Sequence, residues 1–197
     1  MLRPVPGRAL IDAMLAFLDF EASSLGKHSY PIEVGWVFED GRSEAYLIRP
    51  APGWSDWDEA AEAIHHIDRE TLAREGTPHD WVARRMVELL AGHELLASAP
   101  SWDGKWLSAL LRAAGLPRHT LRLRDSDDAC RELATAILAP VVPPDALADT
   151  VTELVAGIAT RLPDQSPAHR ALADAEEERS RWLAVRVAAE AFAAGGA

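Results

Sequence analysis

The sequence has few of the features that mark several large classes of protein. It contains a single cysteine, Cys130, so no disulfide can form within the chain, and a buried thiol in a reducing compartment is the simplest interpretation. No apolar run approaches the length of a membrane span, and residues 1–20 show no long apolar segment before a small-residue cleavage site. We therefore expect a soluble, cytoplasmic protein without a membrane partner.

Basic residues are scarce as well. The chain has 20 lysine and arginine residues against 31 aspartate and glutamate residues, which gives a formal net charge of −11. This balance argues against non-specific binding of long duplex nucleic acid, because the phosphates would be repelled. It leaves room for a local basic groove that binds short or single-stranded ends. Residues 118–124 are the best candidate, with Arg84, Arg85 and Arg112 as others, and a solvated basic face is the alternative.

The chain does contain a regular alternation of strand-like and helix-like segments. Strands are expected at residues 14–21, 32–40, 43–50, 94–98 and 119–124. Asp40-Gly41 is a hairpin signal, so the first three strands are predicted to be antiparallel. Helices are expected at residues 57–67, 78–91, 103–116, 127–138 and 144–160, and from Ser166-Pro167 to about residue 194. We find no internal repeat and no low-complexity linker.

Two carboxylates end the first predicted strand. Asp19 and Glu21 are two residues apart, so they project from one face of the strand, while Leu18 and Phe20 project from the other. Acids at the end of a buried apolar strand are costly unless a cation compensates their charge, and Mg²⁺ or Mn²⁺ would do so. A pair of solvated acids is the alternative.

Two later segments carry further candidate residues. Asp103 stands where a predicted strand has ended and a helix begins, and taken alone it is a helix N-cap. His169 stands five residues before Asp174. In a regular helix that spacing separates two side chains by about 140°, so they would not share a face. A helical acid on a solvated face, with a histidine near the cap, is the alternative here.

The three segments, in this order, resemble the DEDDh branch of the DEDD superfamily of 3′–5′ exonucleases, which includes bacterial proofreading subunits, RNase T and oligoribonuclease. The resemblance extends from about residue 14 to about residue 190. It includes YPIEVGWVF (30–38) and AIHHID (63–68), and HRALADA (169–175) is its most specific part. It implies an α/β, RNase H-like fold with a five-stranded mixed sheet flanked by helices, in one exonuclease domain spanning residues 1–197.

The resemblance also implies a site and a reaction. Asp19, Glu21, Asp103 and Asp174 would hold two divalent metal ions, Mg²⁺ or Mn²⁺, and His169 would be the general base. In this pattern the histidine stands at or just before the first helical turn, so the 140° separation does not apply. Contacts with the substrate are expected at Phe20, Ala22, Ser23, His65 and His66. The predicted function is metal-dependent hydrolysis of single-stranded DNA or RNA 3′ ends, or of short oligonucleotides.

The chain departs from the family pattern around these residues. Ser98-Ala99 replaces a usual His-Asn, Ala22-Ser23-Ser24 replaces Thr-Thr-Gly, and His66 replaces a glycine. These changes bear on substrate preference more than on catalysis. A proofreading-type nuclease in a larger assembly and a non-catalytic module that binds nucleic acid or protein remain alternatives. Homodimer formation and the choice between DNA and RNA stay open.

Four tryptophans near these segments have two interpretations each. Trp54 and Trp57 would stack on nucleic-acid bases or pack a long loop onto the domain. Trp102 and Trp106, on either side of Asp103, are predicted to belong to the core.

Overall fold

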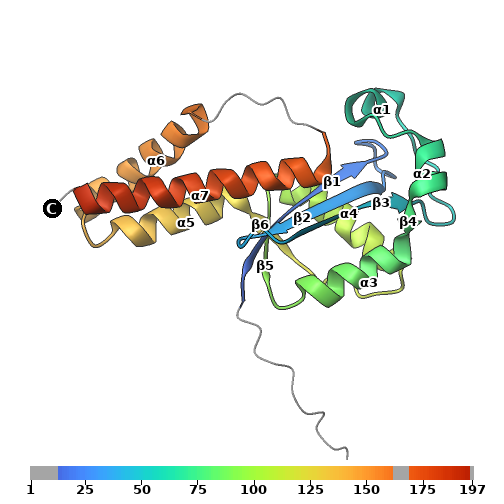
Figure 1. Cartoon of the computed structure of the whole chain (residues 1–197), viewed down its shortest axis with the longest axis horizontal. Helices are drawn as coiled ribbons and strands as arrows, with labels where there is room; N and C mark the ends of the chain where they lie inside the picture. The colour runs from blue at the N-terminus through green and yellow to red at the C-terminus, as the bar shows by residue number, and fades with distance from the viewer. Residues whose placement is uncertain (1–12, 162–168, 196–197) are drawn as a thin grey trace, which may run out of the picture.

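The computed structural model describes residues 13–161 and 169–195, which form a mixed sheet with helices on both faces (Figure 1). Its strands are β1 (Leu15–Ala22), β2 (Pro31–Phe38), β3 (Ser43–Arg49), β4 (Thr77–Pro78), β5 (Glu94–Ala97) and β6 (Leu123–Asp125). Its helices are α1 (Glu59–His65), α2 (Arg69–Glu75), α3 (His79–Leu90), α4 (Pro100–Ala113), α5 (Ser126–Leu138), α6 (Pro144–Arg161) and α7 (Ala171–Gly195).

The first three strands form the antiparallel meander that the sequence predicts. β1 pairs with β2 and β2 with β3, both antiparallel. Gly41 turns the chain between β2 and β3 with a φ of +92°, a left-handed conformation that costs glycine little. The sheet has six strands, one more than the five predicted, because the two-residue β4 pairs with the edge strand β3. The strand order is β4-β3-β2-β1-β5-β6.

The other half of the sheet is parallel. β5 lies parallel to β1, and β6 lies parallel to β5. The carboxyl ends of β1, β5 and β6 therefore meet at one edge of the sheet. Residues that follow these ends are brought together there, whatever their separation along the chain.

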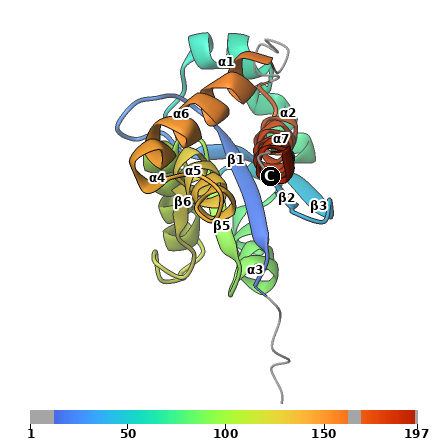
Figure 2. The same cartoon turned by 90° about the vertical axis from the view of Figure 1, so that its left-hand side faces the viewer.

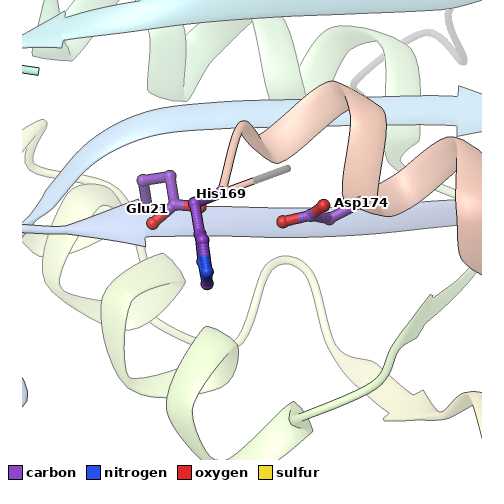
Figure 3. A group of neighbouring side chains, drawn as sticks. All are labelled: Glu21, His169 and Asp174. Carbon is purple, nitrogen blue, oxygen red and sulfur yellow. The ribbon is translucent and has the colours of Figure 1, made fainter. Parts of the chain in front are cut away.

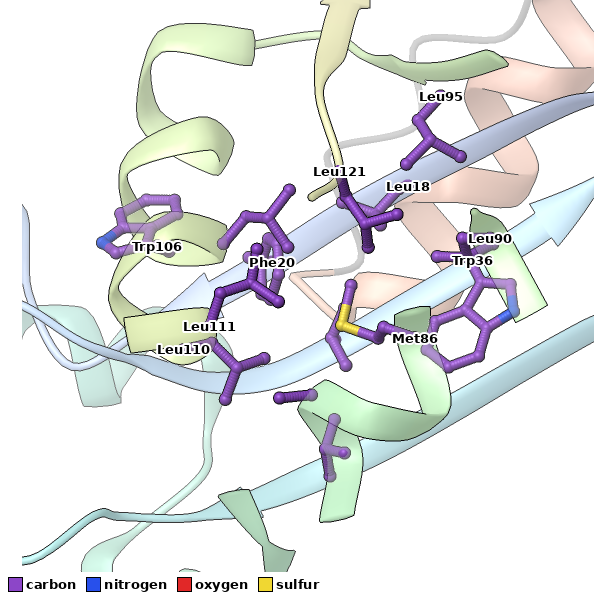
Figure 4. Packing of buried hydrophobic residues seen from close by; sticks show 14 of the residues in the cluster. Leu18, Phe20, Trp36, Met86, Leu90, Leu95, Trp106, Leu110, Leu111 and Leu121 are labelled. Carbon is purple, nitrogen blue, oxygen red and sulfur yellow. The ribbon is translucent and has the colours of Figure 1, made fainter. Parts of the chain in front are cut away.

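Alternation along β1 divides the interior into two hydrophobic clusters. Leu18 and Phe20 pack with Trp36 of β2 and with side chains of α3 and α4 (Figure 4). Phe17 points to the opposite face, where its ring lies 6.1 Å from that of Trp182 in α7. Asp19 and Glu21 continue the row that Phe17 begins. Their carboxylates therefore emerge on the face of the sheet that α7 covers.

The first turn of α7 lies directly against β2. A Cβ atom on Gly35 would stand 2.3 Å from the backbone nitrogen of Leu172 and 2.5 Å from its Cα. Helix and strand are thus in backbone contact at this point. From there α7 runs across the sheet and continues beside α5 (Figures 1 and 2).

Several element boundaries differ from expectation. α7 begins at Ala171, later than predicted, and the expected start at Ser166-Pro167 lies outside the described residues. α4 begins at Pro100, one turn before the predicted residue 103. The sequence interpretation missed α2, a helix of seven residues, and the three-residue strand β6 covers only residues 123 and 124 of the expected strand 119–124.

No helix in the described ranges combines the length and the apolar character that crossing a membrane requires.

Candidate active site

One cleft is lined by three of the four acids that the sequence singles out, Asp19, Glu21 and Asp174. It lies at the sheet edge where β1 and β5 end, beneath the first turns of α7, and has a volume of about 340 Å³. Its lining consists of Asp19, Phe20, Glu21, Ser98, His169, Asp174, Glu177 and Glu178. Most of these side chains are carboxylates, so the cleft is a place of concentrated negative charge.

Glu21, His169 and Asp174 form the tightest group in the cleft. One potential metal-binding atom from each of the three lies within 4.8 Å of those of the other two. Figure 3 shows Glu21 at the end of β1, His169 just before α7 and Asp174 in the first turn of that helix, with its carboxylate directed toward the other two. Two carboxylates and an imidazole at this separation suit a divalent cation.

Asp103 is buried beside this group, with only 1% of its surface exposed. It lies in the first turn of α4, whose N-cap is Ala99, so the interpretation of Asp103 as an N-cap is wrong. Its Oδ2 atom has no hydrogen-bond partner among the described residues. A buried carboxylate oxygen without a partner is unfavourable unless a cation or a proton compensates it.

Burial and mutual repulsion raise the pKa values of three carboxyl groups. Burial, followed by the charges of Asp103, Glu21 and Asp174, raises the pKa of Asp19 to about 9. Burial raises the pKa of Glu21 to about 7, with Asp174 as the largest repelling charge, and burial also raises the pKa of Asp103 to about 7. At neutral pH this cluster therefore retains protons unless cations replace them.

The chain before α7 has the geometry that the motif requires. His169 has a φ of +49°, so it adopts the left-handed conformation and stands outside the regular helix, which begins two residues later. The 140° separation expected within a helix does not apply to it. His169 and Asp174 consequently reach the cleft together.

Glu33 of β2 holds this segment in place. Its carboxylate is 4% exposed and accepts hydrogen bonds from Nε and Nη2 of Arg170, the shortest at 2.7 Å. Its Oε2 also accepts the backbone N–H of Ala171 at 3.1 Å. Glu33 therefore caps α7 from another element. It stands opposite Glu21 in the sheet, and its charge contributes to the raised pKa of that residue.

Three of the predicted substrate contacts, at Phe20, Ala22 and Ser23, have buried side chains. Phe20 lines the cleft, but its ring packs in the hydrophobic cluster beneath α4. Ser23 exchanges two hydrogen bonds with the backbone of Tyr30: its Oγ accepts at 3.1 Å, and its N–H donates at 3.0 Å. Of these three, only Phe20 borders the cleft.

The two adjacent histidines differ in their surroundings. His65 is 3% exposed, and its Nδ1 accepts the N–H of Ile67 at 3.0 Å, so the proton of the neutral ring is on Nε2. That Nε2 has no partner in the part of the chain that the structure describes. His66 is exposed, has a φ of +57° and lines a separate cavity of about 860 Å³ with Trp57. Neither histidine lines the acidic cleft.

The tryptophans divide between the two interpretations. Trp54 stacks on Tyr30 at 5.1 Å, and Trp106 is buried, so both belong to the interior. Trp102 is 38% exposed, and its prediction as a core residue is wrong. Lys105 lies 4.8 Å from its ring centre and donates a hydrogen bond to the carbonyl of Gly26.

The sequence interpretation also missed Glu33. The only local signal is an acid within the otherwise uncharged strand PIEVGWVF, all of whose residues are buried. An acid in such a strand indicates a partner elsewhere in the fold, but not which partner.

The arrangement of the strands and helices defines the fold class of the protein. The mixed sheet, with an antiparallel meander beside parallel strands and helices on both faces, is RNase H-like, and solved structures of exonuclease I match this fold. The protein therefore has this exonuclease fold.

Several of the matching structures are of exonuclease I. The complex of E. coli exonuclease I with a dA16 oligonucleotide has a TM-score of 0.63 and 17% sequence identity, with 89% of this chain and 41% of that chain covered. The moderately thermophilic exonuclease I of Methylocaldum szegediense has a TM-score of 0.63 and 17% identity, with 87% and 40% covered. A zinc-bound complex of E. coli exonuclease I with single-stranded DNA has a TM-score of 0.60 and 17% identity, with 91% and 40% covered.

These likenesses concern the fold. The chain spans less than half the length of the exonuclease I chains that it matches. No family model matches the sequence, and a comparison with curated protein sequences gives no match either.

Proposed function

We propose that the protein is a divalent-metal-dependent 3′–5′ exonuclease that hydrolyses single-stranded nucleic-acid ends or short oligonucleotides. The observation that carries the proposal is the convergence of Asp19, Glu21, Asp103 and Asp174 with His169. These residues come from β1, α4 and the start of α7 in a fold shared with exonuclease I. Concentrated carboxylates are the ligands that phosphodiester hydrolysis with two hard cations requires.

The residues fit such cations on two grounds. The buried Oδ2 of Asp103 lacks a hydrogen-bond partner among the described residues. Burial raises the pKa values of Asp19, Glu21 and Asp103, and neighbouring carboxylates add to the shift at Asp19 and Glu21. Asp19, Glu21, Asp103 and Asp174 would hold two ions, Mg²⁺ or Mn²⁺. Bound there, the ions would neutralise the phosphodiester and favour ionisation of a water.

His169 is assigned the proton transfer. Its imidazole stands at the cleft outside the regular helix, and in the neutral form one ring nitrogen accepts the proton of the attacking water. Glu33 and Arg170 orient this step indirectly, because they hold the backbone on which His169 is carried. Water attacks phosphorus, the P–O3′ bond breaks, and a 5′-mononucleotide leaves.

Single-stranded DNA is the substrate of first choice. The matching exonuclease I structures include complexes with dA16 and with dT13 oligonucleotides. We assign contacts with the nucleotide to exposed His66, and His65, which is buried and accepts the N–H of Ile67, supports the turn that carries it. Phe20, Ala22 and Ser23 then support the substrate from beneath. RNA would offer the same phosphates and an additional 2′-hydroxyl.

A non-catalytic binding module is the alternative from another class. It would keep the fold and the cleft but would have no need for a complete set of four carboxylates and a histidine. The raised pKa values disfavour it, because a cluster that destabilises the folded state is unlikely to persist in a fold without a use for cations.

The decisive experiment is degradation of matched DNA and RNA oligomers, two to twelve nucleotides long, with Mg²⁺ or Mn²⁺. A 5′ label should yield a ladder that shortens from the 3′ end, and chelation should stop the reaction. A 3′ label should appear at once as mononucleotide. Cleavage that continues in a chelator, or a ladder that starts from the 5′ end, would refute the proposal.

A further inference from the structure

Polyanion binding needs positive charge that the acidic cleft does not have. The cleft contributes five carboxylates and a single imidazole to its lining. Cations bound in the cleft would neutralise the reacting phosphate. The remaining phosphates of a strand would still be repelled by a molecule with a net charge of −11. A strand longer than the cleft therefore requires cationic side chains beyond it.

A groove beside the cleft has the required charge. It has a volume of about 410 Å³ and lies between α4 and the segment that leads into β6. Its lining consists of Pro100, Gly104, Leu107, Ser108, Arg118, His119, Leu121, Arg122 and Leu123. This lining holds two arginines and a histidine but no acid, in a protein with many more acids than bases.

The two arginines of the groove form no ion pair with an acid in the described part of the chain. Elsewhere arginines commonly pair with acids; Arg85, for example, contacts Glu44 and Glu88. Among the described residues neither Arg118 nor Arg122 has a carboxylate partner, and Arg118 donates only to His119, at 2.9 Å. Exposed guanidinium groups without an acid are available for phosphate oxygens.

The groove begins close to the cleft along the chain. Ser98 lines the cleft, and Pro100, two residues later, lines the groove. From there the groove follows one face of α4 to Ser108, a rise of about 12 Å, which is room for roughly two to three nucleotides. A Cβ on Gly104 would meet no atom within 4 Å, so this wall is open.

The floor and the walls differ in a way that suits a single strand. Leu107 and Leu121 are buried and form an apolar floor, while Arg118 and Arg122 are exposed. Apolar surface favours bases and guanidinium groups favour phosphates. The larger cavity beside Trp57 is a poor alternative, because Glu59, Glu62 and Asp68 line it.

We propose that the groove formed by α4 and residues 118–123 binds the phosphate backbone of a single strand, on the 5′ side of the nucleotide held in the acidic cleft. This assignment rests on the proposed function, since it takes the cleft as the place of the 3′ end. It makes Arg118 and Arg122 determinants of substrate length. A dinucleotide would not reach them, whereas a twelve-residue strand would.

The test compares two double variants with equal changes of charge. Arg118→Glu/Arg122→Glu reverses the groove, and Arg49→Glu/Arg84→Glu reverses two exposed arginines of β3 and α3 that have no carboxylate partner among the described residues. Binding of fluorescein-labelled dT12 and hydrolysis of dT2 and dT12 are measured. The groove variant should bind dT12 at least tenfold more weakly, and its salt dependence should lose about 1.4 in log–log slope for two phosphate contacts. Hydrolysis of dT2 should stay near the wild-type rate.

Several outcomes decide between the possibilities. Equal weakening in both double variants would mean that total charge, not the groove, governs binding, and would overturn the proposal. Loss of dT2 hydrolysis together with dT12 hydrolysis would also overturn it, unless Arg118→Lys/Arg122→Lys restores both and thereby reveals damage by the glutamates. Failure of the wild-type protein to cleave any oligomer, with dT12 still bound through the groove, would refute the nuclease and leave the groove.

Discussion

At the scale of single residues, Asp19 is the acid under the greatest electrostatic strain. Burial, and after it repulsion by Asp103, Glu21 and Asp174, raises the pKa of Asp19 to about 9. A carboxylate in this position destabilises the folded protein without metal and would strengthen the binding of a cation. Stability and activity should therefore respond to its substitution in opposite directions.

We predict that Asp19→Asn lowers metal-dependent cleavage by more than about 10²-fold, the scale on which one transition-state contact affects turnover. The shape is kept, but the charge that would hold the ions is lost. In a chelator the variant should melt at an equal or higher temperature than the wild type, because one member of a repelling cluster is neutral. Thermal melting and an oligonucleotide assay test both parts. Near-normal cleavage would place the activity elsewhere.

His169 provides a second residue-scale prediction. His169→Ala should lower turnover by about 10²–10⁴-fold and change the Michaelis constant little, because cations held by the carboxylates would still bind the substrate phosphate. The acidic limb of the wild-type pH–rate profile should be lost in the variant.

His66 is the matched control, since its backbone is also left-handed, with a φ of +57° against +49° for His169. His66→Ala also places an alanine in a left-handed backbone conformation, but it should affect substrate binding more than turnover. Equal pH profiles for wild type and His169→Ala would show that His169 takes no part in proton transfer.

At the scale of elements, the position of α7 against the sheet decides whether the site forms. Two contacts set this position: the backbone approach at Gly35 and the cap provided by Glu33. Both connect residues of β2 with residues far along the chain.

Gly35→Ala should destabilise the protein by at least about 1–3 kcal/mol, the usual cost of an overpacked contact. The added Cβ would stand 2.3 Å from the backbone of Leu172, which cannot rotate away as a side chain would. Gly157→Ala in α6 is the control: nothing lies within 4 Å, so helix propensity should stabilise it by up to about 1 kcal/mol. Chemical denaturation compares the two. Similar effects at both positions would contradict the close approach.

Glu33→Ala should lower stability by about 1.5–3 kcal/mol, the range for hydrogen bonds to a charged group, because Arg170 and the N–H of Ala171 both lose their acceptor. Turnover should fall with it as His169 loses its support. Glu33→Gln keeps an acceptor for the N–H of Ala171 and should recover much of the loss. If Glu33→Ala lowers stability but leaves the pH–rate profile and turnover unchanged, Glu33 is structural only.

At the scale of the whole molecule, the acidic cluster couples stability to pH. A carboxyl group whose pKa is raised by folding binds its proton more tightly in the folded state, so its contribution is present at low pH and is lost as pH rises through the folded value. The relevant values are about 7 for Glu21 and Asp103 and about 9 for Asp19.

We therefore predict that, in a chelator, the melting temperature falls from about pH 4, where these carboxyl groups ionise in the unfolded chain, to about pH 9, where Asp19 has lost its proton in the folded state. Mg²⁺ or Mn²⁺ at pH 8 should raise it, because the ions bind the folded cluster in place of protons. Melting curves across this range, with and without metal, test the coupling. A melting temperature that is flat with pH, and unchanged by metal, would mean that the cluster is solvated.

The sequence by itself determined the alternation of strands and helices and the antiparallel meander, and it singled out the four acids and the histidine that the proposal uses. Those features depend on local periodicity and on short motifs, such as Asp40-Gly41 and the segment 169–175. The direction of the β1 side chains also followed from periodicity alone, since alternation puts Asp19 and Glu21 on one face of the strand and Leu18 on the other.

Only the tertiary structure decided how these pieces meet. The cap of α7 comes from Glu33, the close approach from Gly35, and the burial of Asp103 from the packing of α4 over the sheet. None of these contacts lies within one element, and a one-dimensional pattern does not specify a partner in another strand or helix. The charge of the groove at Arg118 and Arg122 was visible in the sequence, but its concave shape required the fold.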